Sequence, residues 1–243
     1  PGGIYLVIMP DHTFFEFILS DDQHFKLKTD TAHYLKNLKV TGSEENEVFV
    51  DYQKFLMKNR LEYRDLSERK KQYSNNPDSI KQIQEKMTSL QNKMDEYWQQ
   101  LKQEHPDLFI TKILKASRNI QVPDPPKDEQ GNILDSTFQY RYYKSHFFDN
   151  IDFADERILR TPIYHNKLEY FYDKVIVPHP DSIIKETDTL MEKAKANDEV
   201  FKFTLQSVFN RFNSNKIMGM DAVFVHLGEN YYLNGEATWA DST

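Results

Sequence analysis

The most regular pattern in the chain is a hydrophobic stripe between residues 77 and 104. Its apolar residues are separated alternately by three and four positions: Ile80, Ile83, Met87, Leu90, Met94, Tyr97 and Leu101. This heptad spacing predicts one face of a long amphipathic helix, because most intervening side chains are charged or amides. A looser stripe precedes it: Phe49, Tyr52, Leu56, Tyr63, Leu66 and Tyr73.

A helical hairpin over residues 43–105 follows from these two stripes. Ser43 is suited to cap the first helix, and glutamates follow it in the first turn, where the helix dipole favours acids. Residues 74–77 (SNNP) break the pattern, and such a short loop makes the two helices antiparallel neighbours. Each helix spans roughly 40 Å at its length. Because the seam is narrow, we expect most of their surface to be exposed.

Residues 1–42 have the pattern of short strands separated by turns. Apolar runs at Ile4–Met9, Phe14–Leu19 and Phe25–Lys28 predict a three-stranded antiparallel meander, and residues 31–42 are expected to be a connector. Three strands alone are marginally stable, so they are either the remnant of a larger β domain or a small capping sheet. An unpaired edge at Ile4–Met9 predicts some self-association.

Residues 106–243 have the pattern of a helical domain with short breaks. Asn119–Asp135 contains three prolines, a glycine and four acids, which predicts a loop that is either a linker or a functional flap. The predicted helices begin near His105, Ser136, Asp155, Thr161, Pro180, Glu199 and Met220. We therefore predict a mainly α protein: a multi-helix up-down array with a long antiparallel αα-hairpin and a small N-terminal antiparallel β-meander.

Composition narrows the function classes. The chain of 243 residues has a formal net charge of −7, which argues against a nucleic-acid-binding or anionic-membrane surface. No apolar run has the length of a transmembrane segment. The absence of cysteine excludes disulfides, thiolate metal sites and a cysteine nucleophile within these residues. No dinucleotide-binding, P-loop or nucleophile-elbow motif is present.

Aromatic residues are densest between residues 138 and 172, and two interpretations stay open for them. Aromatic side chains on several faces of one helix favour a buried element. They also favour a groove for a peptide or glycan, since aromatics are enriched at interfaces. The candidate partner-binding surface is Phe138, Tyr142, Tyr143, Phe147, Phe148, Asp152, Glu156 and Arg157.

Acidic and basic residues alternate in the same stretch: Asp149, Asp152, Asp155, Glu156, Arg157 and Arg160. Acids at a predicted helix start favour capping and ion pairing. The alternative is acid–base chemistry or cation binding, which needs carboxylates that converge in a cleft.

None of the eight histidines has metal-ligand spacing, and we predict that His165 and His226 face the core. Lys216–Asp221 reads as a loop that feeds the last helix. In it Gly219 is expected to be left-handed, and Asp221 is a candidate N-cap.

Two segments, His146–Pro162 and Lys216–His226, carry a family resemblance. They resemble an uncharacterised helical domain of exported thioredoxin-like proteins of Gram-negative bacteria. In that family the helical domain lies between a β-rich domain of unknown function and a C-terminal thioredoxin-fold thiol–disulfide oxidoreductase domain. The resemblance covers Asp107–Thr243, and the opening strands with Val40–Ser43 resemble the end of the β-rich domain.

What the resemblance implies is an accessory role. The family's chemistry uses a C-x-x-C pair, which this chain lacks, so it implies no catalytic residue and no cofactor here. It implies a thioredoxin-fold domain of the same protein as partner and a protein or peptide substrate. It also implies a location in the periplasm or cell envelope, and it allows a lipid anchor on a segment before Pro1.

Three functional hypotheses follow. The leading one is a non-catalytic module that positions substrate for the thiol–disulfide oxidoreductase domain. The second is a free-standing peptide- or glycan-binding module of the cell envelope. The third is a hydrolase that uses Asp149, Asp152 or Glu156.

Overall fold

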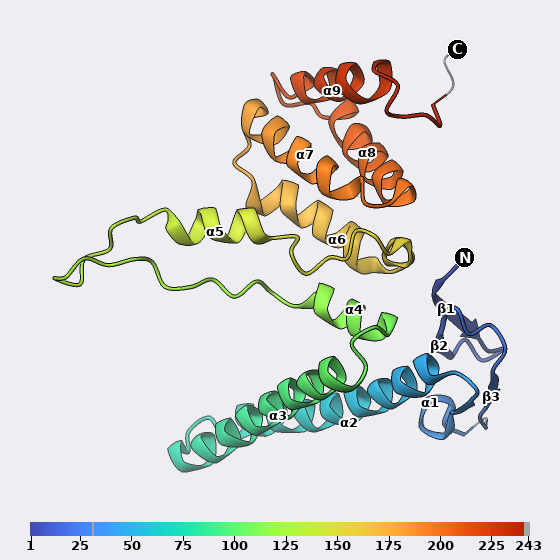
Figure 1. The fold of residues 1–243 in the computed structure, drawn as a ribbon. Coiled ribbons are helices and arrows are strands. Elements are labelled where there is room, and N and C mark those ends of the chain that lie inside the picture. The colour runs from blue at the N-terminus through green and yellow to red at the C-terminus, as the bar shows by residue number, and fades with distance from the viewer. Residues whose placement is uncertain (31, 241–243) are drawn as a thin grey trace. The chain divides into compact units, whose positions relative to one another are not determined.

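The structure is a computed structural model that describes residues 1–30 and 32–240. The chain divides into two compact units, Pro1–Leu114 and Lys115–Thr243. Helices make up 59% of the residues, which confirms the predicted mainly α class (Figure 1). The domain boundaries predicted after residues 42 and 105 stay predictions.

The first unit begins with short strands and continues into two long helices and most of a short one. Its elements are β1 (Gly3–Ile8), β2 (Phe14–Leu19), β3 (Lys26–Lys28), α1 (Tyr34–Asn37), β4 (Lys39–Thr41), α2 (Glu44–Gln72), α3 (Pro77–Glu104) and α4 (Phe109–Ser117).

The strands form two separate two-stranded antiparallel sheets, β1 with β2 and β3 with β4. The predicted three-stranded meander and the plain connector at residues 31–42 are therefore wrong. The Asn46 side chain, on α2, accepts the N–H of Ile18 (2.7 Å) and donates to its carbonyl (2.8 Å), so it occupies the edge of β2 that a third strand needs. Leu27 of β3 instead faces Val40 of β4, and both pack beside the buried Phe15–Leu38–Val50 cluster.

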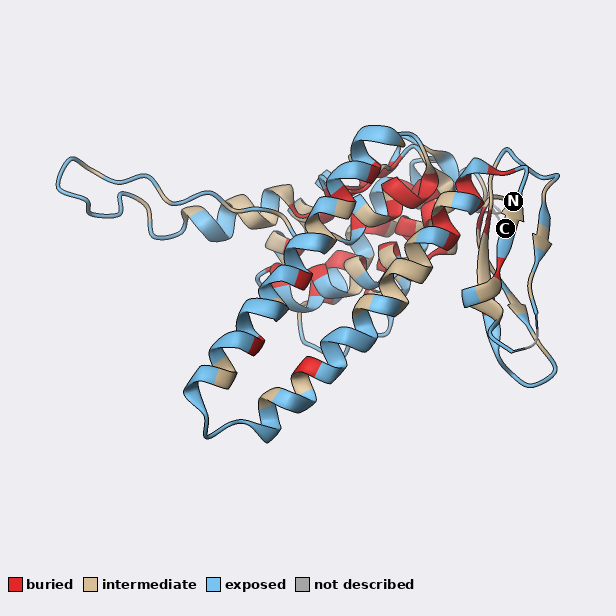
Figure 2. Cartoon of the chain, turned by 90° about the horizontal axis from the view of Figure 1, so that it is seen from below, coloured by how far each residue is buried: buried red, intermediate tan, exposed pale blue. Residues whose placement is uncertain are grey.

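The helical hairpin is confirmed with both predicted starts. Ser43 accepts the N–H of Asn46 and caps α2, while Asn76 caps α3, which has Pro77 in its first turn. Leu66, Ile83 and Leu90 form the buried seam, with Met87 packed against them. Figure 2 shows most of the hairpin surface exposed, as the narrow stripe predicts.

The stripe of α2 is less continuous than that of α3. Tyr63 and Tyr73 lie in solvent with 51% and 42% of their surface exposed, although the sequence pattern placed both in the stripe. Phenol rings tolerate water at one end, so a tyrosine at a heptad position is a weaker core signal than a leucine.

A buried carboxylate fixes the start of α4. Glu45, on α2, accepts the backbone N–H groups of Phe109 (2.8 Å) and Ile110 (2.9 Å). The first N–H groups of a helix have no partner within the helix, and a carboxylate also complements the positive end of its dipole. An acid of the predicted first turn of α2 therefore serves a second helix, 64 residues away in sequence.

The second unit is a helical bundle. Its elements are α5 (Phe138–His146), the 3₁₀ helix η1 (Glu156–Arg160), α6 (Pro162–Tyr170), the π-helical turn η2 (Phe171–Val175), α7 (Pro180–Ala194), α8 (Asp198–Asn213), α9 (Asp221–Leu227) and the π-helical turn η3 (Gly228–Leu233).

One continuous core runs through this unit, and its centre is fully buried at Tyr164, Met191, Leu205 and Leu227. Threonine hydroxyls serve the buried phenols: Tyr164 Oη lies 2.5 Å from Thr204 Oγ1. A second pair joins Tyr172 to Thr187 at 3.0 Å.

Local details of the second unit differ from the prediction in three places. The helix expected from Asp155 is a 3₁₀ turn, capped by Asp155 and ended at Thr161, which caps α6 in turn. Asp221 lies inside the first turn of α9 and makes no cap hydrogen bond, whereas Gly219 has the predicted positive φ of 86°. His165 is exposed, so the prediction that it faces the core is wrong.

The loop predicted at Asn119–Asp135 is confirmed. Apart from a bridge between Lys127 and Ile133 it contains no strand or helix, and the Asp128 side chain holds its tip by accepting N–H groups of Gln130 and Asn132. Figure 1 shows it as a long excursion between α4 and α5.

The helix that follows this loop overturns one prediction. No residue of α5 is buried, although its aromatic side chains on several faces predicted a buried helix. The chain enters the core only after α5, at Phe147 and Phe148.

Candidate functional site

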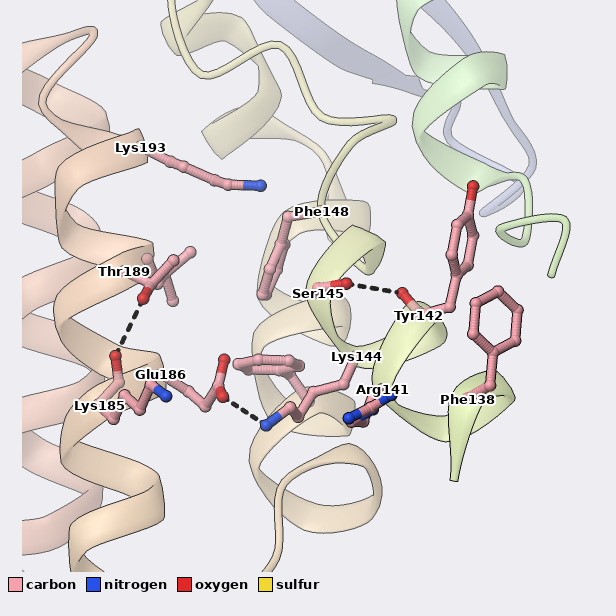
Figure 3. Close-up of a pocket in the computed structure, with 12 residues that line it drawn as sticks. Phe138, Arg141, Tyr142, Lys144, Ser145, Phe148, Lys185, Glu186, Thr189 and Lys193 are labelled. Carbon is pink, nitrogen blue, oxygen red and sulfur yellow. Dashed lines mark hydrogen bonds and ion pairs between the residues drawn. The ribbon is translucent and has the colours of Figure 1, made fainter. Parts of the chain in front are cut away.

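The exposed face of α5 forms one side of a groove whose other side is α7. The groove has a volume of about 560 Å³, within the range that ligand pockets have in proteins. Figure 3 shows Lys144 and Glu186 pointing toward one another across the space between the two helices. Their Nζ and Oε1 atoms are 2.5 Å apart.

Three buried apolar side chains make the floor of this α5–α7 groove: Phe148, Phe171 and Leu190. Phe148 and Phe171 meet edge to face with centroids 4.8 Å apart. On α5, one turn apart, the half-buried rings of Phe138 and Tyr142 have centroids separated by 6.0 Å. Both rings line the groove, so a bound group would contact aromatic surface without a large rearrangement.

Cationic side chains line the groove from both helices. Arg141 pairs with Asp135, Lys144 with Glu186, and Lys193 with Asp149 at 3.1 Å. Lys185 is exposed on α7, and no ion pair to it occurs in residues 1–30 and 32–240.

Asp149 holds one end of the groove together. It receives Lys193 from α7, and His146 Nδ1 lies 2.5 Å from its second oxygen. Partial burial alone raises the pKa of Asp149, but the hydrogen bonds from His146 and Lys193 outweigh it, so the pKa is lowered. The His146 ring also packs on Tyr142 at 4.1 Å, which ties the aromatic side of the groove to this acid.

A comparison with protein families identifies the family to which the chain belongs. Residues 72–240 match the model of a family described as a domain of unknown function, DUF5106, which is well over half of the chain. The chain belongs to this family. No curated protein and no solved structure matches it. The uncharacterised helical domain expected from the resemblance is confirmed to that extent, and the match does not bear on thioredoxin-like proteins.

The α5–α7 groove lies wholly within the DUF5106 region, and it gathers three of the eight candidate surface residues: Phe138, Tyr142 and Phe148. Phe147 is buried in the core, and Tyr143 packs against that core half-buried. Neither lines the groove.

The remaining three candidate residues serve local structure. Asp152 accepts the N–H of Ala154 at 3.1 Å. Glu156 pairs with Arg160, and Arg157 forms an ion pair with Asp155 at 2.6 Å. Ion pairing is therefore confirmed for Glu156 and Arg157, and helix capping is confirmed for Asp155.

A second polar cluster of the DUF5106 domain lies on α7, α9 and η3. His226 Nε2 lies 2.8 Å from Asp188 Oδ1, and Tyr231 donates its hydroxyl to the same oxygen at 2.9 Å. Burial, then the hydrogen bond to Asp188, raises the pKa of Tyr231. His226 is half-buried and paired, so this cluster ties the last helices to α7.

No set of three or more histidine, aspartate or glutamate side chains in the described part of the chain is arranged to hold a metal ion. Within the same residues, no helix combines the length and apolar character that crossing a membrane requires.

Sequence reasoning missed the α7 side of the groove. Lys185, Thr189 and Lys193 are spaced four residues apart and therefore share one face of the helix. This signal is visible in the sequence. It is also the ordinary pattern of a solvated helix, and only the tertiary structure shows that the face lies opposite aromatic rings.

Proposed function

We propose that this DUF5106 protein is a non-catalytic accessory module, which positions protein substrates for a thioredoxin-fold thiol–disulfide oxidoreductase domain of the same protein. The observation that supports the proposal is the α5–α7 groove, with its apolar floor, aromatic rings and cationic rim. In this proposal the module works in the periplasm or cell envelope.

The lining of the groove is suited to binding. Ser145 donates its hydroxyl to the Tyr142 carbonyl at 3.1 Å, and Glu186 is held by Lys144. Both side chains are therefore engaged by neighbouring groups of the groove lining. Since the sequence contains no cysteine, disulfide exchange belongs to residues outside it.

The aromatic pair also supports the second candidate function, which is a free-standing peptide- or glycan-binding module of the cell envelope. Phe138 and Tyr142 present neighbouring rings at the groove, and an aromatic face suits a sugar ring as well as an apolar side chain. The third hypothesis has less support, because Asp149, Asp152 and Glu156 are each held by different partners.

The test uses the parent protein, which is the longer protein that the proposal expects to contain this chain and the thioredoxin-fold domain. Its sequence after Thr243 should contain a C-x-x-C motif, and its reduction of disulfide-containing protein substrates should depend on the groove. Replacing both Phe138 and Tyr142 by alanine should raise KM about tenfold and leave kcat unchanged, because binding is lost and the chemistry is not. Tyr73→Ala, which truncates an exposed tyrosine on the hairpin, is the matched control.

Either of two results would contradict the proposal. If the parent protein contains no C-x-x-C motif, the redox role is refuted and the free-standing binding module is favoured. A parent with C-x-x-C whose KM ignores both groove substitutions removes the groove from substrate positioning.

A further inference from the structure

The charges around the α5–α7 groove are unequal. Four cationic residues line it against one carboxylate, Glu186. Adding Asp135 and Asp149, which pair with lining residues from outside, gives four cations and three carboxylates. The uncompensated cation is Lys185.

This local excess is opposite to the charge of the whole chain, which is −7. A polyanion such as nucleic acid would be repelled by that overall charge. A single carboxylate placed at Lys185 meets one uncompensated ammonium group, so the charges of groove and ligand are complementary.

The surroundings of Lys185 define what accompanies the carboxylate. Thr189 lies one turn further along α7, roughly 6 Å away along the axis, and its neighbour Leu190 belongs to the groove floor. Phe148 and Phe171 complete the floor. A large apolar side chain packed there would lie within one or two residues of an acid bound at Lys185, which fits an extended polypeptide.

We infer that the α5–α7 groove binds an extended, acidic protein segment, with Lys185 pairing with an Asp or Glu side chain and the Phe148–Phe171–Leu190 floor taking an adjacent large apolar side chain. The inference rests on the proposed function and names its substrate class. The Lys144–Glu186 pair joins α5 to α7 beside Lys185, and the inferred segment lies along α7.

The test uses the chain of 243 residues and fluorescein-labelled peptides of glycine and serine that carry one Asp beside one Phe. Fluorescence anisotropy should show binding of this peptide, and replacing its Asp by Asn should weaken binding about tenfold, as loss of one charge-assisted hydrogen bond does. Replacing its Phe by Ser should also weaken binding. Raising the salt concentration should reduce the preference for Asp over Asn.

Charge reversal separates recognition from mere stability. Lys185→Glu should abolish the preference for Asp and create one for a peptide with Lys in its place. Lys216→Glu is the matched control, because Lys216 is exposed on the loop before α9 and does not line the groove. The inference would be overturned if a folded Lys185→Glu variant bound every peptide with the affinity of the wild type.

The outcomes also distinguish the inference from the proposed function. Equal affinity for the Asp and Asn peptides refutes acidic recognition and leaves substrate positioning intact. A clear Asp preference combined with a parent enzyme whose KM ignores Phe138 and Tyr142 refutes substrate positioning alone. Binding of an anionic oligosaccharide while every peptide stays unbound overturns the inference and favours the glycan-binding candidate.

Discussion

The hairpin of α2 and α3 and the core of the second unit are stabilised in different ways. The hairpin seam buries Leu66, Ile83 and Leu90 between two helices that are otherwise largely exposed. The second unit buries a continuous apolar core from Ala116 to Ala237. Hydrophobic burial scales with the apolar area removed from water, so the seam contributes far less than the core.

Buried polar residues show the same contrast. At the base of the hairpin they are an amide and a carboxylate, Asn46 and Glu45, which hold backbone groups of β2 and α4. In the second unit the buried Thr187 and Thr204 meet tyrosine hydroxyls, while the buried Thr161 caps α6. Where apolar burial is scarce, hydrogen bonds of buried polar groups fix the fold, and losing them leaves unsatisfied backbone groups.

The largest expected difference comes from deleting one leucine in each region. Leu205→Ala should lower the free energy of unfolding by about 3–5 kcal/mol, because it opens a cavity in a closed core. Leu90→Ala should cost about 2 kcal/mol, since solvent and mobile neighbours can fill the seam. Urea unfolding with hydrogen exchange resolved by segment measures both, and equal costs would contradict the contrast.

Asn46→Ala should cost about 2–4 kcal/mol, because it strips partners from the buried N–H and carbonyl of Ile18 and from Ser43. Hydrogen exchange should speed up in β1 and β2 before it does in α3. Asn59→Ala removes a single bond to the Phe55 carbonyl on the same helix and serves as the control. Similar costs for both variants would show that Asn46 does not anchor the hairpin of strands.

Tyr164→Phe should cost about 1 kcal/mol, the net worth of one hydrogen bond, here the one to Thr204. Tyr170→Phe alters a ring that is 51% exposed and should change the stability hardly at all. Thermal unfolding of the two variants side by side checks this, and a cost for Tyr170→Phe as large as for Tyr164→Phe would contradict it.

The pH dependence of the free energy of unfolding should show the contribution of the Asp149 carboxylate. Its folded pKa is lowered, so its contribution is present above the unfolded pKa and disappears as the pH falls through the folded pKa. Asp149→Asn should therefore flatten the acid limb of the stability curve, which urea titrations between neutral and acidic pH measure. Asp221→Asn, which removes an exposed carboxylate that does not line the groove, is the control.

The smallest effect concerns self-association through Ile4–Met9, which stays a prediction. The outer face of this strand exposes Leu6 and Ile8, with 69% of Ile8 accessible. Ile8→Lys should remove any association that light scattering detects at high concentration, since charge on an edge strand opposes pairing. A wild-type chain that is monomeric throughout the concentration range rules the idea out.

The sequence predicted the hairpin well because its signals are local. Ser43, Pro77 and the heptad stripe each act within a few residues, and the structure has both helices where these signals place them. The pairing of β3 with β4 escaped prediction, since two three-residue strands carry almost no periodicity and depend on Asn46 occupying the edge of β2.

Only the α5 side of the groove was predicted from the sequence, because the α7 side depends on tertiary structure. The aromatic density of Phe138 and Tyr142 was visible, but aromatic side chains on several faces favoured a buried helix as well as a groove, and no residue of α5 is buried. Lys185 on α7 looks like any solvated lysine. Its distinction is that it forms no ion pair within residues 1–30 and 32–240, which only the tertiary structure reveals.

The first residue of the family match has a practical consequence for producing the protein. Residue 72 is the last residue of α2, so a gene fragment cut at the family boundary would encode α3 without its partner helix. Ile83 and Leu90 would then face water, and the N–H groups of Phe109 and Ile110 would lose Glu45. Such a fragment should collect in inclusion bodies, whereas one that starts before Ser43 should stay in the lysate supernatant.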